Sequence, residues 1–258
     1  MKNIFSIFIT LIIIFSYSSH AQVNTERYRQ DADTIGFSGL ADVEAVVATG
    51  NTDFQLISIG GRLNYNWGND YTFVVANGGY GWESGEEFVD QLFAHLRHVI
   101  TPSELIQIEL FTQFDNNKKR LLLERELYGG GLRFRLVKSD FFKFRLGIGY
   151  MFENEFYDLP ANSIHQSHST AHRLTSYLTF IFNFDKTFSF VSISYYQPEF
   201  VEWNDYKFVS ENELIIDTGS LVDFYIKFNL RYDSRTADTI KNIDTFSKLG
   251  LSFKFGGR

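Results

Sequence analysis

Polar and apolar residues alternate strictly near the end of the chain. In residues 248–255, KLGLSFKF, leucine and phenylalanine occupy every second position, and lysine, glycine and serine occupy the others. Residues 221–232, LVDFYIKFNLRY, keep the same period of two. Successive side chains of a β-strand point to opposite faces, so each stretch predicts a strand with one apolar and one polar face. A strand that ends a chain needs a partner, which predicts either a sheet edge or the seam of a barrel.

The same alternation recurs along most of the chain and predicts about twelve antiparallel strands. Their expected ranges are 36–49, 53–67, 70–83, 87–101, 103–115, 122–137, 140–154, 170–184, 187–199, 205–216, 220–233 and 243–255. Tight turns follow every second strand, and the links between them are longer, with the short link at 50–52 as an exception. Short turns at one end and long loops at the other are typical of outer-membrane barrels, whose periplasmic turns are short.

Alternation also fits a soluble β-sandwich or a lipocalin-like barrel. The strands expected here are about twice as long as soluble strands, which average about 5–6 residues. Their polar faces repeatedly carry Arg, Lys, Asp and Glu, which suits a wet lumen. We therefore predict an all-β fold: a closed antiparallel transmembrane β-barrel over residues 36–255, closed by residues 248–255 against the first strand. An even strand number places both termini at one side, the periplasm.

Composition agrees with β structure and narrows the function. The chain has 28 Phe, 14 Tyr and only 3 Pro, a balance that favours strands. The net charge of -7 argues against a nucleic-acid partner, which normally meets a basic face. The absence of cysteine excludes disulfides, thiolate metal sites and cysteine nucleophiles.

The first residues predict export. Lys2 precedes an apolar stretch at 4–15, and Ser19-His20-Ala21 offers a cleavage site before Gln22. The apolar stretch is shorter than the roughly 20 residues of a membrane-spanning helix, although an uncleaved N-terminal anchor is the alternative. We expect a signal peptide over residues 1–21, a loose periplasmic leader over 22–35, and location in the outer membrane of a Gram-negative bacterium.

Four stretches carry a resemblance to a known family. They are ATGNTD at 48–53, GGGLRFRL at 129–136, YDSRTADTIKNIDT at 232–245 and the closing LGLSFKF. In this order they resemble a family of salt-induced outer-membrane proteins, a domain of unknown function. The resemblance covers residues 36–255 and implies an outer-membrane barrel with an envelope role connected to salt, without a known activity or ligand.

The closing strand is also similar to the signal read by the barrel-assembly machinery. The residues that match it are Lys248, Gly250, Phe253 and Phe255, although three residues follow the last aromatic position. The resemblance thus implies two partners, the assembly machinery and the lipid and lipopolysaccharide of the outer membrane. A basic stretch at 118–120 is expected in a loop that either contacts outer-leaflet phosphates or is simply solvated.

Histidines are the candidate chemical groups. His165, His168 and His172 lie in HQSHSTAHR, which we place in and beside the longest loop. A lipid hydrolase would need a serine activated by a histidine, and a metal site would need the three imidazoles to converge. The chain has no G-x-S-x-G nucleophile elbow and the long loop fixes no geometry, and the histidine spacing would converge on a helix but not on a strand. We therefore expect no catalytic residue, no enzyme activity, no metal ion and no cofactor.

The inward-facing residues predict a lumen with two charged walls. Pairing through a tight turn at 138–140 places glycines and basic residues on one inner wall. The expected pairs are Gly131 with Gly147, Gly129 with Gly149, Arg133 with Arg145, and Arg135 with Lys143. Pairing through 217–219 places Glu213 opposite Asp223, with Glu211 nearby, on an acidic wall.

These walls leave two readings of the lumen. Either opposite charges neutralise each other across a narrow, closed lumen, or the basic ladder, formed by Arg133, Arg135, Lys143 and Arg145, attracts mobile anions. We therefore expect an outer-membrane barrel of unknown specific activity that is structural or weakly permeable. The alternatives are a small anion-preferring channel and, from the histidine loop, a lipid hydrolase.

Overall fold

A computed structural model of the chain describes residues 35–48, 54–83, 86–237 and 240–256. The expected signal peptide, nearly all of the leader and the turn at 50–52 lie outside the described residues.

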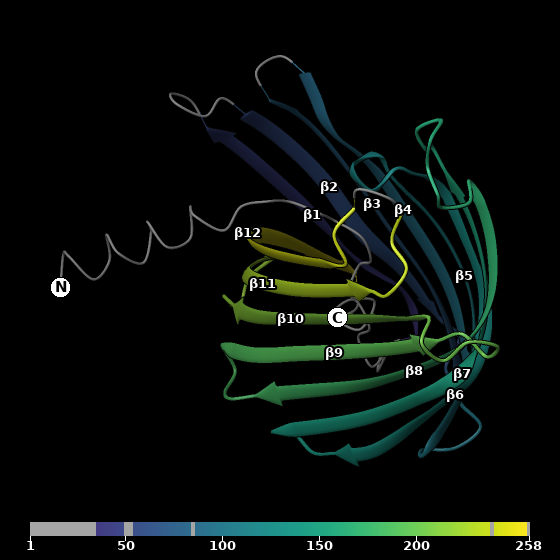
Figure 1. The fold of residues 1–258 in the computed structure, drawn as a ribbon. Coiled ribbons are helices and arrows are strands. Elements are labelled where there is room, and N and C mark those ends of the chain that lie inside the picture. Colours follow the sequence, from purple (N-terminus) through teal and green to yellow (C-terminus); the bar gives the residue numbers. More distant parts are fainter. Residues whose placement is uncertain (1–34, 49–53, 84–85, 238–239, 257–258) are drawn as a thin grey trace.

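The described residues form one closed barrel of twelve antiparallel strands (Figure 1). Each strand pairs with its neighbours in sequence, and the last pairs with the first. The strands are β1 (Gly36–Ala48), β2 (Phe54–Asn66), β3 (Asp70–Glu83), β4 (Glu86–Ile100), β5 (Ile106–Asn117), β6 (Leu122–Lys138), β7 (Phe142–Tyr157), β8 (His168–Asn183), β9 (Phe188–Pro198), β10 (Tyr206–Asp217), β11 (Val222–Asp233) and β12 (Ile243–Gly256), with a 3-10 turn η1 (Lys118–Arg120) after β5. The predicted fold class is confirmed.

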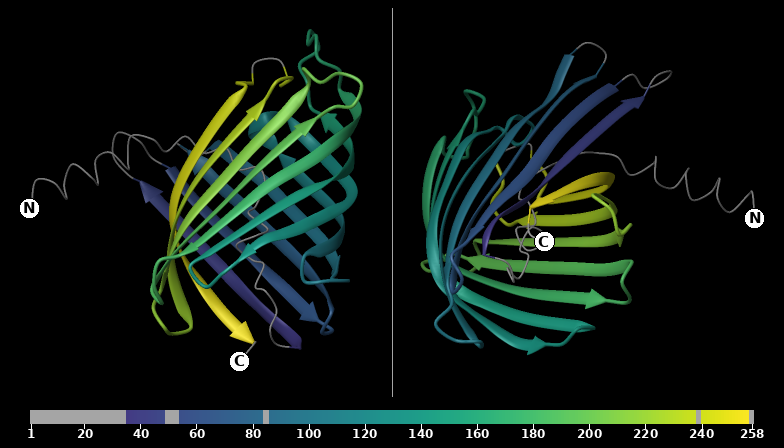
Figure 2. Two further views of the ribbon diagram at one scale, coloured as in Figure 1. Left: turned by 90° about the horizontal axis from the view of Figure 1, so that it is seen from below. Right: turned by 180° about the vertical axis from the view of Figure 1, so that it is seen from behind.

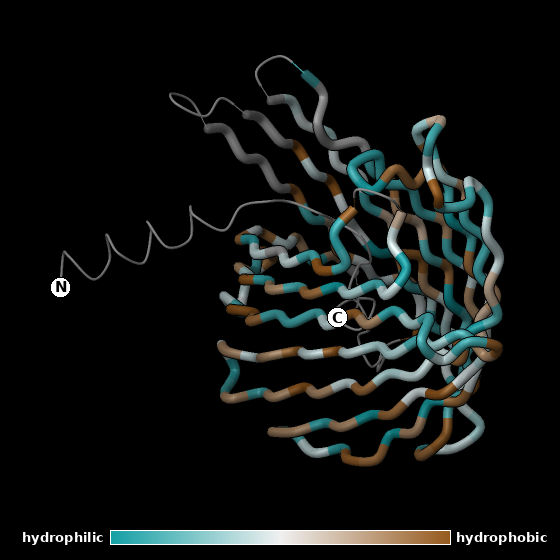
Figure 3. The backbone as a smooth tube through the Cα atoms, in the orientation of Figure 1, coloured by the Kyte–Doolittle hydropathy of each residue, from teal (hydrophilic) through white to brown (hydrophobic). Residues whose placement is uncertain are grey.

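The two faces of the barrel wall have opposite polarity, as β11 illustrates. Phe224, Ile226 and Phe228 are exposed on the outer surface, whereas Tyr225 and Lys227 are buried inside. Figure 3 shows the alternation of hydrophobic and hydrophilic positions along the strands. Apolar outside and polar inside is the arrangement of a barrel whose outer surface meets lipid.

Loop length separates the two ends of the barrel. The end that carries the turns after β2, β4, β6, β8 and β10, together with the start of β1 and the end of β12, is the short-turn end. The opposite, long-loop end carries η1 and the links 158–167, 199–205 and 234–242. Aromatic pairs lie on the outer surface at both ends, with Tyr65 against Trp67 at the first and Tyr80 against Trp82 at the second.

No helix among the described residues is long and apolar enough to cross a membrane.

Two hairpins differ in register from the prediction. At the turn after β6, Lys138 pairs with Lys143, and the ladder then shifts between Arg135 and Val137. The register predicted here is therefore wrong, because the turn is longer than expected and an irregularity follows it. The observed pairs are Gly131 with Gly149, Gly129 with Met151, Arg133 with Gly147, and Arg135 with Arg145.

The turn after β10 is also longer than predicted. Asp217 pairs with Asp223, so Glu213 lies opposite Lys227 and not opposite Asp223. Gly219 adopts a φ of 71° in this turn, and its N–H donates to Asp217 Oδ1 at 2.7 Å. The link 218–221, with Gly219 in the left-handed region, is longer than the predicted turn at 217–219 and therefore sets a different register.

Candidate functional site

The inner wall of the barrel has an apolar sector, in which Asp42, Arg62 and Arg97 are also buried, and a charged sector. In the apolar sector, inward side chains of β1, β3 and β4 form a buried hydrophobic cluster: Leu40, Tyr71, Phe73, Val75, Phe93 and Val99. In the charged sector, β5 to β11 carry buried acidic and basic side chains along most of their inner faces. Charges survive burial only when they are paired and hydrogen-bonded, so the charged sector must supply its own partners.

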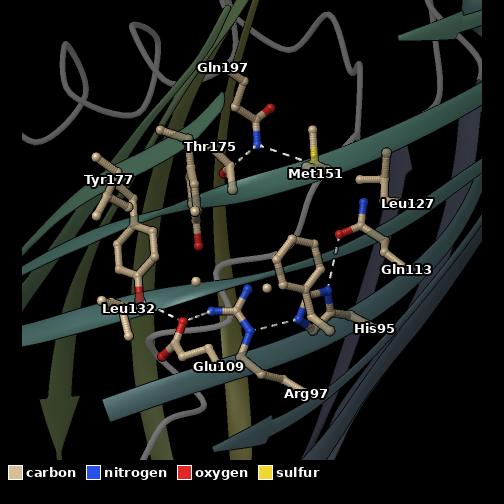
Figure 4. Close-up of a pocket in the computed structure, with 16 residues that line it drawn as sticks. His95, Arg97, Glu109, Gln113, Leu127, Leu132, Met151, Thr175, Tyr177 and Gln197 are labelled. Carbon is tan, nitrogen blue, oxygen red and sulfur yellow. Dashed lines mark hydrogen bonds and ion pairs between the residues drawn. The ribbon is translucent and has the colours of Figure 1, made fainter. Parts of the chain in front are cut away.

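Glu109 on β5 connects three other strands of the barrel, and Figure 4 draws its contacts with Arg97 and Tyr177. Its Oε2 accepts hydrogen bonds from Arg97 Nη1 of β4 at 3.0 Å and from the Tyr177 hydroxyl of β8 at 2.7 Å. Its Oε1 lies 4.0 Å from Arg133 Nε of β6, whose Nη1 donates to Gln107 at 2.7 Å. Since β5 and β8 are not neighbours, the bond between Glu109 and Tyr177 crosses the inner face of β6 and β7.

Glycines make room for this bridge. Gly147 lies directly opposite Tyr177, and a methyl group added at Gly147 would overlap the tyrosine ring. Gly131 and Gly149 lie directly opposite each other, and a Cβ on either would meet the backbone of the other strand. The missing side chains form a groove in the wall that holds the ring of Tyr177.

A second layer of ion pairs lies toward the long-loop end. Glu153 on β7 accepts from Arg173 Nε of β8 at 3.0 Å and also binds Lys207 of β10. Lys207 donates to Glu155 at 2.6 Å, and Arg173 donates to Asp205 at 2.9 Å. All five side chains are buried, and each of the three carboxylates has a cation beside it. Such pairing is what a buried charge requires.

The long-loop end is partly covered above this layer. Arg120 of η1 lies 3.5 Å from Asp233 at the end of β11. Ala237, in the link after β11, packs with Leu122 of β6 and Tyr157 of β7. The link therefore reaches over the mouth of the barrel from β11 to the strands on the other side (Figure 1).

Among the described residues, this part of the barrel contains an inner and an outer cavity. The inner one, about 40 Å³, is lined by the side chains around Glu109 and Tyr177 and by Gly131 and Gly149. A space of that size holds only a few water molecules. The outer one, about 470 Å³, lies under the long loops beside Arg173 and Lys207. Of the ion-pair layer, Glu155, Arg173, Asp205 and Lys207 line the outer cavity, and none of them lines the inner one.

The structure gives the predicted basic ladder a different partner. Arg133 and Arg145 are buried inside the barrel, whereas Arg135 and Lys143 lie nearer the short-turn end and are half-exposed. Arg133 meets Gln107 and Glu109 of the adjacent β5. The sequence did not reveal Glu109 as a partner of Arg133, because only the pairing of β6 with β7 was considered and not the pairing of β6 with β5. The inward position of Glu109 in the alternation of IQIEL at 106–110 was the available signal.

The predicted acidic wall also has cations beside it. Glu211 and Glu213 are buried on β10, and Glu213 lies opposite Lys227, which itself lies opposite Lys248 of β12. Asp223 binds Lys254 Nζ at 3.0 Å. The wall is therefore a mixed acidic and basic surface formed by β10, β11 and β12.

The three histidines do not form a joint site. His165 lies in the link and His172 on β8, as expected, whereas His168, which was expected in the loop, begins β8; His168 and His172 lie on the outer face of that strand. His168 stacks on Phe156, and His172 Nδ1 lies 2.6 Å from the Tyr150 hydroxyl. Within the described ranges, no three His, Cys, Asp or Glu side chains are placed to hold a metal ion.

The residues of the expected assembly signal divide between the two faces of β12. Phe253 and Phe255 are exposed on the outer surface opposite Ala41 and Gly39 of β1. Gly250 lies opposite Tyr225, and a Cβ there would overlap the tyrosine ring. Recognition by the assembly machinery stays a prediction.

A closed antiparallel barrel with an apolar outer surface and a charged interior defines the class of outer-membrane β-barrels. The family described as protein of unknown function, DUF481, matches residues 41–255, and the chain belongs to this family. The expected membership in a barrel family of unknown function is confirmed. No curated protein matches the chain.

Solved barrels share this fold at very low sequence identity. A NanC porin aligns at 9% identity and a TM-score of 0.52, covering 84% of this chain and 100% of that chain. The KdgM porin in complex with disordered oligogalacturonate aligns at 10% identity and 0.46, covering 85% and 99%. The translocator domain of the autotransporter NalP from Neisseria meningitidis aligns at 8% and 0.48, covering 87% and 90%. These likenesses concern the fold alone.

Proposed function

We propose that the protein is an outer-membrane barrel whose lumen is closed at rest, with a structural or binding role in the envelope. The observation that carries this proposal is the bridge from Tyr177 across β6 and β7 to Glu109, with Arg97 and Arg133 on the same carboxylate. The second ion-pair layer around Glu153 lies above it. Because the charges neutralise each other within the wall, a continuous charged conduit is not required.

Planar-bilayer recording tests the closed lumen. We expect wild-type protein to give no steady conductance, and Tyr177→Ala to raise conductance because it removes the ring that bridges from β8 over β6 and β7 to Glu109. Tyr177→Phe is the matched control, since it keeps the ring and loses only the hydroxyl. A steady anion-selective wild-type current that disappears in the Arg133→Glu/Arg145→Glu double variant would instead establish the anion channel.

The orientation is part of the same proposal. We place the short-turn end and both termini in the periplasm, because long loops of outer-membrane barrels lie outside the cell. A protease site inserted beside Asn162, in the link 158–167, should be cut on intact cells. The same site inserted beside Ser139 should be cut only after the outer membrane is permeabilised, and the reverse pattern would invert the topology.

Outer-leaflet lipopolysaccharide is the proposed partner of the long-loop end. Lys118 and Lys119 begin η1 at that end, where lysine ammonium groups can meet lipid phosphates. The implied connection to salt belongs to the same proposal. A deletion strain should then grow more slowly than its parent in high salt, and equal growth would remove this part of the proposal.

We propose no enzymatic role. His168 and His172 face outward, and each contacts an aromatic residue of β7. A lipase or esterase assay on refolded protein tests this view, and turnover lost in His168→Ala or His172→Ala would contradict it.

A further inference from the structure

The outer cavity is large enough for a small molecule. Its volume of about 470 Å³ lies within the range of roughly 300–1,000 Å³ that is usual for ligand pockets. Residues of β7, β8 and β10 and of the links 158–167, 199–205 and 234–242 line it. Figure 2 shows these three links at the same end of the barrel. Strands and links of the long-loop end together therefore enclose the cavity.

The wall of the outer cavity carries acidic and basic side chains in balance. The charged residues that line it are three cations and three anions: Arg173, Lys207, Arg235, Glu155, Glu199 and Asp205. A guest with a single charge would meet both attraction and repulsion from such a wall. A guest that carries one group of each sign matches it better, because each of its charges can meet an opposite one.

Most of these charges already have a partner within the wall. Lys207 donates to Glu155 at 2.6 Å. Arg173 Nη1 donates to Asp205 Oδ1 at 2.9 Å. Two groups of opposite sign are left over, the Glu199 carboxylate and one nitrogen of Arg173.

The Glu199 carboxylate makes no hydrogen bond or ion pair within the described part of the chain, although it attracts Arg235 at longer range. Arg235 is itself paired with Glu202, and its Nη1 lies 3.7 Å from Asp205 Oδ2. Glu199 therefore offers a carboxylate to the cationic group of a guest.

Arg173 has one nitrogen without a partner. Its Nε donates to Glu153, and its Nη1 donates to Asp205 and to the Gln197 carbonyl. Its Nη2 makes no hydrogen bond with the described residues, although the side chain is buried and lines the cavity. A guanidinium with a spare N–H is a charge-assisted donor for a carboxylate.

The two leftover groups come from neighbouring positions. Arg173 and Glu199 face each other in an isolated antiparallel bridge, and both line the cavity. Facing residues of antiparallel strands have Cα atoms about 4.5–5.5 Å apart. The two side chains nevertheless form no ion pair, since Glu153 and Asp205 already hold the guanidinium. A spare cationic donor and a spare carboxylate thus lie side by side in one cavity.

We propose that the outer cavity binds a small zwitterion that carries a carboxylate and a primary ammonium group, of the size of an amino acid or a dipeptide. The guest carboxylate accepts from Arg173 Nη2, and the guest ammonium donates to Glu199. Ser169, which lies opposite Glu155 in the ladder, places a hydroxyl beside them. The site goes beyond the closed lumen proposed above and does not depend on it, because the guest needs access from the long-loop end alone.

Isothermal titration calorimetry on refolded protein tests the site with glycylglycine as the probe. A nonionic detergent is required, so that no detergent head group carries both charges. Two matched probes each lack one charge: N-acetylglycine lacks the ammonium group, and glycine N-methylamide lacks the carboxylate. We expect glycylglycine to bind at least about tenfold more tightly than either, because each of the other probes leaves one protein group unpaired.

Two carboxylate variants in the link 199–205 test the ammonium contact. Glu199→Gln should weaken the binding of glycylglycine about tenfold and should not weaken that of N-acetylglycine, because only the contact with the ammonium group is lost. Glu202→Gln is the matched control, since Glu202 pairs with Arg235 and does not line the cavity. It should leave both affinities unchanged. Heat-modifiable migration before each titration selects folded barrels.

Arg173→Lys tests the carboxylate contact. The lysine keeps a cation beside Glu153 and removes the spare nitrogen, so glycylglycine should bind about tenfold more weakly, whereas glycine N-methylamide should bind as before. A purely structural role of Arg173 would weaken both probes alike.

Three results would overturn the proposal. The first is the absence of glycylglycine binding to wild-type protein at millimolar concentration. The second is equal affinity for glycylglycine and N-acetylglycine, which would indicate a site for anions alone. The third is an equal effect of Glu199→Gln and Glu202→Gln. None of these results bears on the closed lumen, which fails only if wild-type protein conducts ions along the barrel axis.

Discussion

The two sectors of the inner wall are filled by different means. In the apolar sector, Phe73 and Val75 are completely buried, and the Arg62 guanidinium lies 4.5 Å from the centre of the Phe73 ring. In the charged sector, Glu153 is equally buried but is held by hydrogen bonds from Arg173 and Lys207. The apolar sector is filled by side-chain contact, and the charged sector is filled by paired charges.

The two sectors differ in how strictly each depends on the identity and position of its neighbouring side chains. Apolar packing depends on volume and tolerates neighbours of similar size, whereas a buried charge depends on one partner in one position. The charged sector, joined across strands by Tyr177 and Glu109, therefore fixes the shape of the lumen. The apolar sector borders the seam between β1 and β12.

Phe73→Ala should have the largest effect on stability. A cavity in the apolar sector should lower the free energy of unfolding by about 4 kcal/mol, and the loss should not change with salt because no ion pair is removed. Urea unfolding of refolded barrel in detergent, at low and high salt, measures it. Phe73→Leu is the matched control and should lose much less. A strong salt dependence would show that the sectors are not distinct.

Glu153→Ala is the corresponding change in the charged sector. It should cost about 3 kcal/mol, because Lys207 and Arg173 each lose a buried partner while Glu155 and Asp205 remain beside them. The same urea titration measures it. Glu153→Gln, which keeps the volume and an acceptor oxygen, should cost less. Equal losses in both variants would mean that the charge itself contributes little.

Gly147→Ala tests the groove that holds Tyr177. The added methyl group overlaps the ring, so we expect a loss of about 1–3 kcal/mol. Combining it with Tyr177→Ala should remove most of this extra cost, since the ring is then absent. A double-mutant cycle gives the coupling energy, and strictly additive losses would show that the glycine groove and the tyrosine act independently.

Arg235→Ala should have the smallest effect. Arg235 pairs with Glu202 on the surface of the long-loop end and is half-exposed. Exposed pairs contribute less than about 1 kcal/mol and are screened by salt. A loss as large as that of Glu153→Ala, measured by the same titration, would show that the link 234–242 is as important to the barrel as its buried ion pairs.

The strands themselves could be predicted from the sequence. β11 occupies Val222–Asp233 where residues 220–233 were expected, and β3 occupies Asp70–Glu83 as predicted. The pleat of a strand imposes a period of two on any wall with lipid on one face and a wet interior on the other, so the pattern is readable residue by residue.

The contacts between inward-facing side chains of different strands could not be predicted from this alternation. Which inward residue meets which depends on register, and a two-residue change at the turn after β6 placed Arg133 opposite Gly147 instead of Arg145. The bond between Tyr177 and Glu109 joins residues 68 apart on strands that do not pair, through a groove made by glycines. The sequence determined the wall and its two faces, because alternation is local. Only the closed tertiary structure decided the ion-pair partners, because these depend on where the whole ring of strands brings distant positions together.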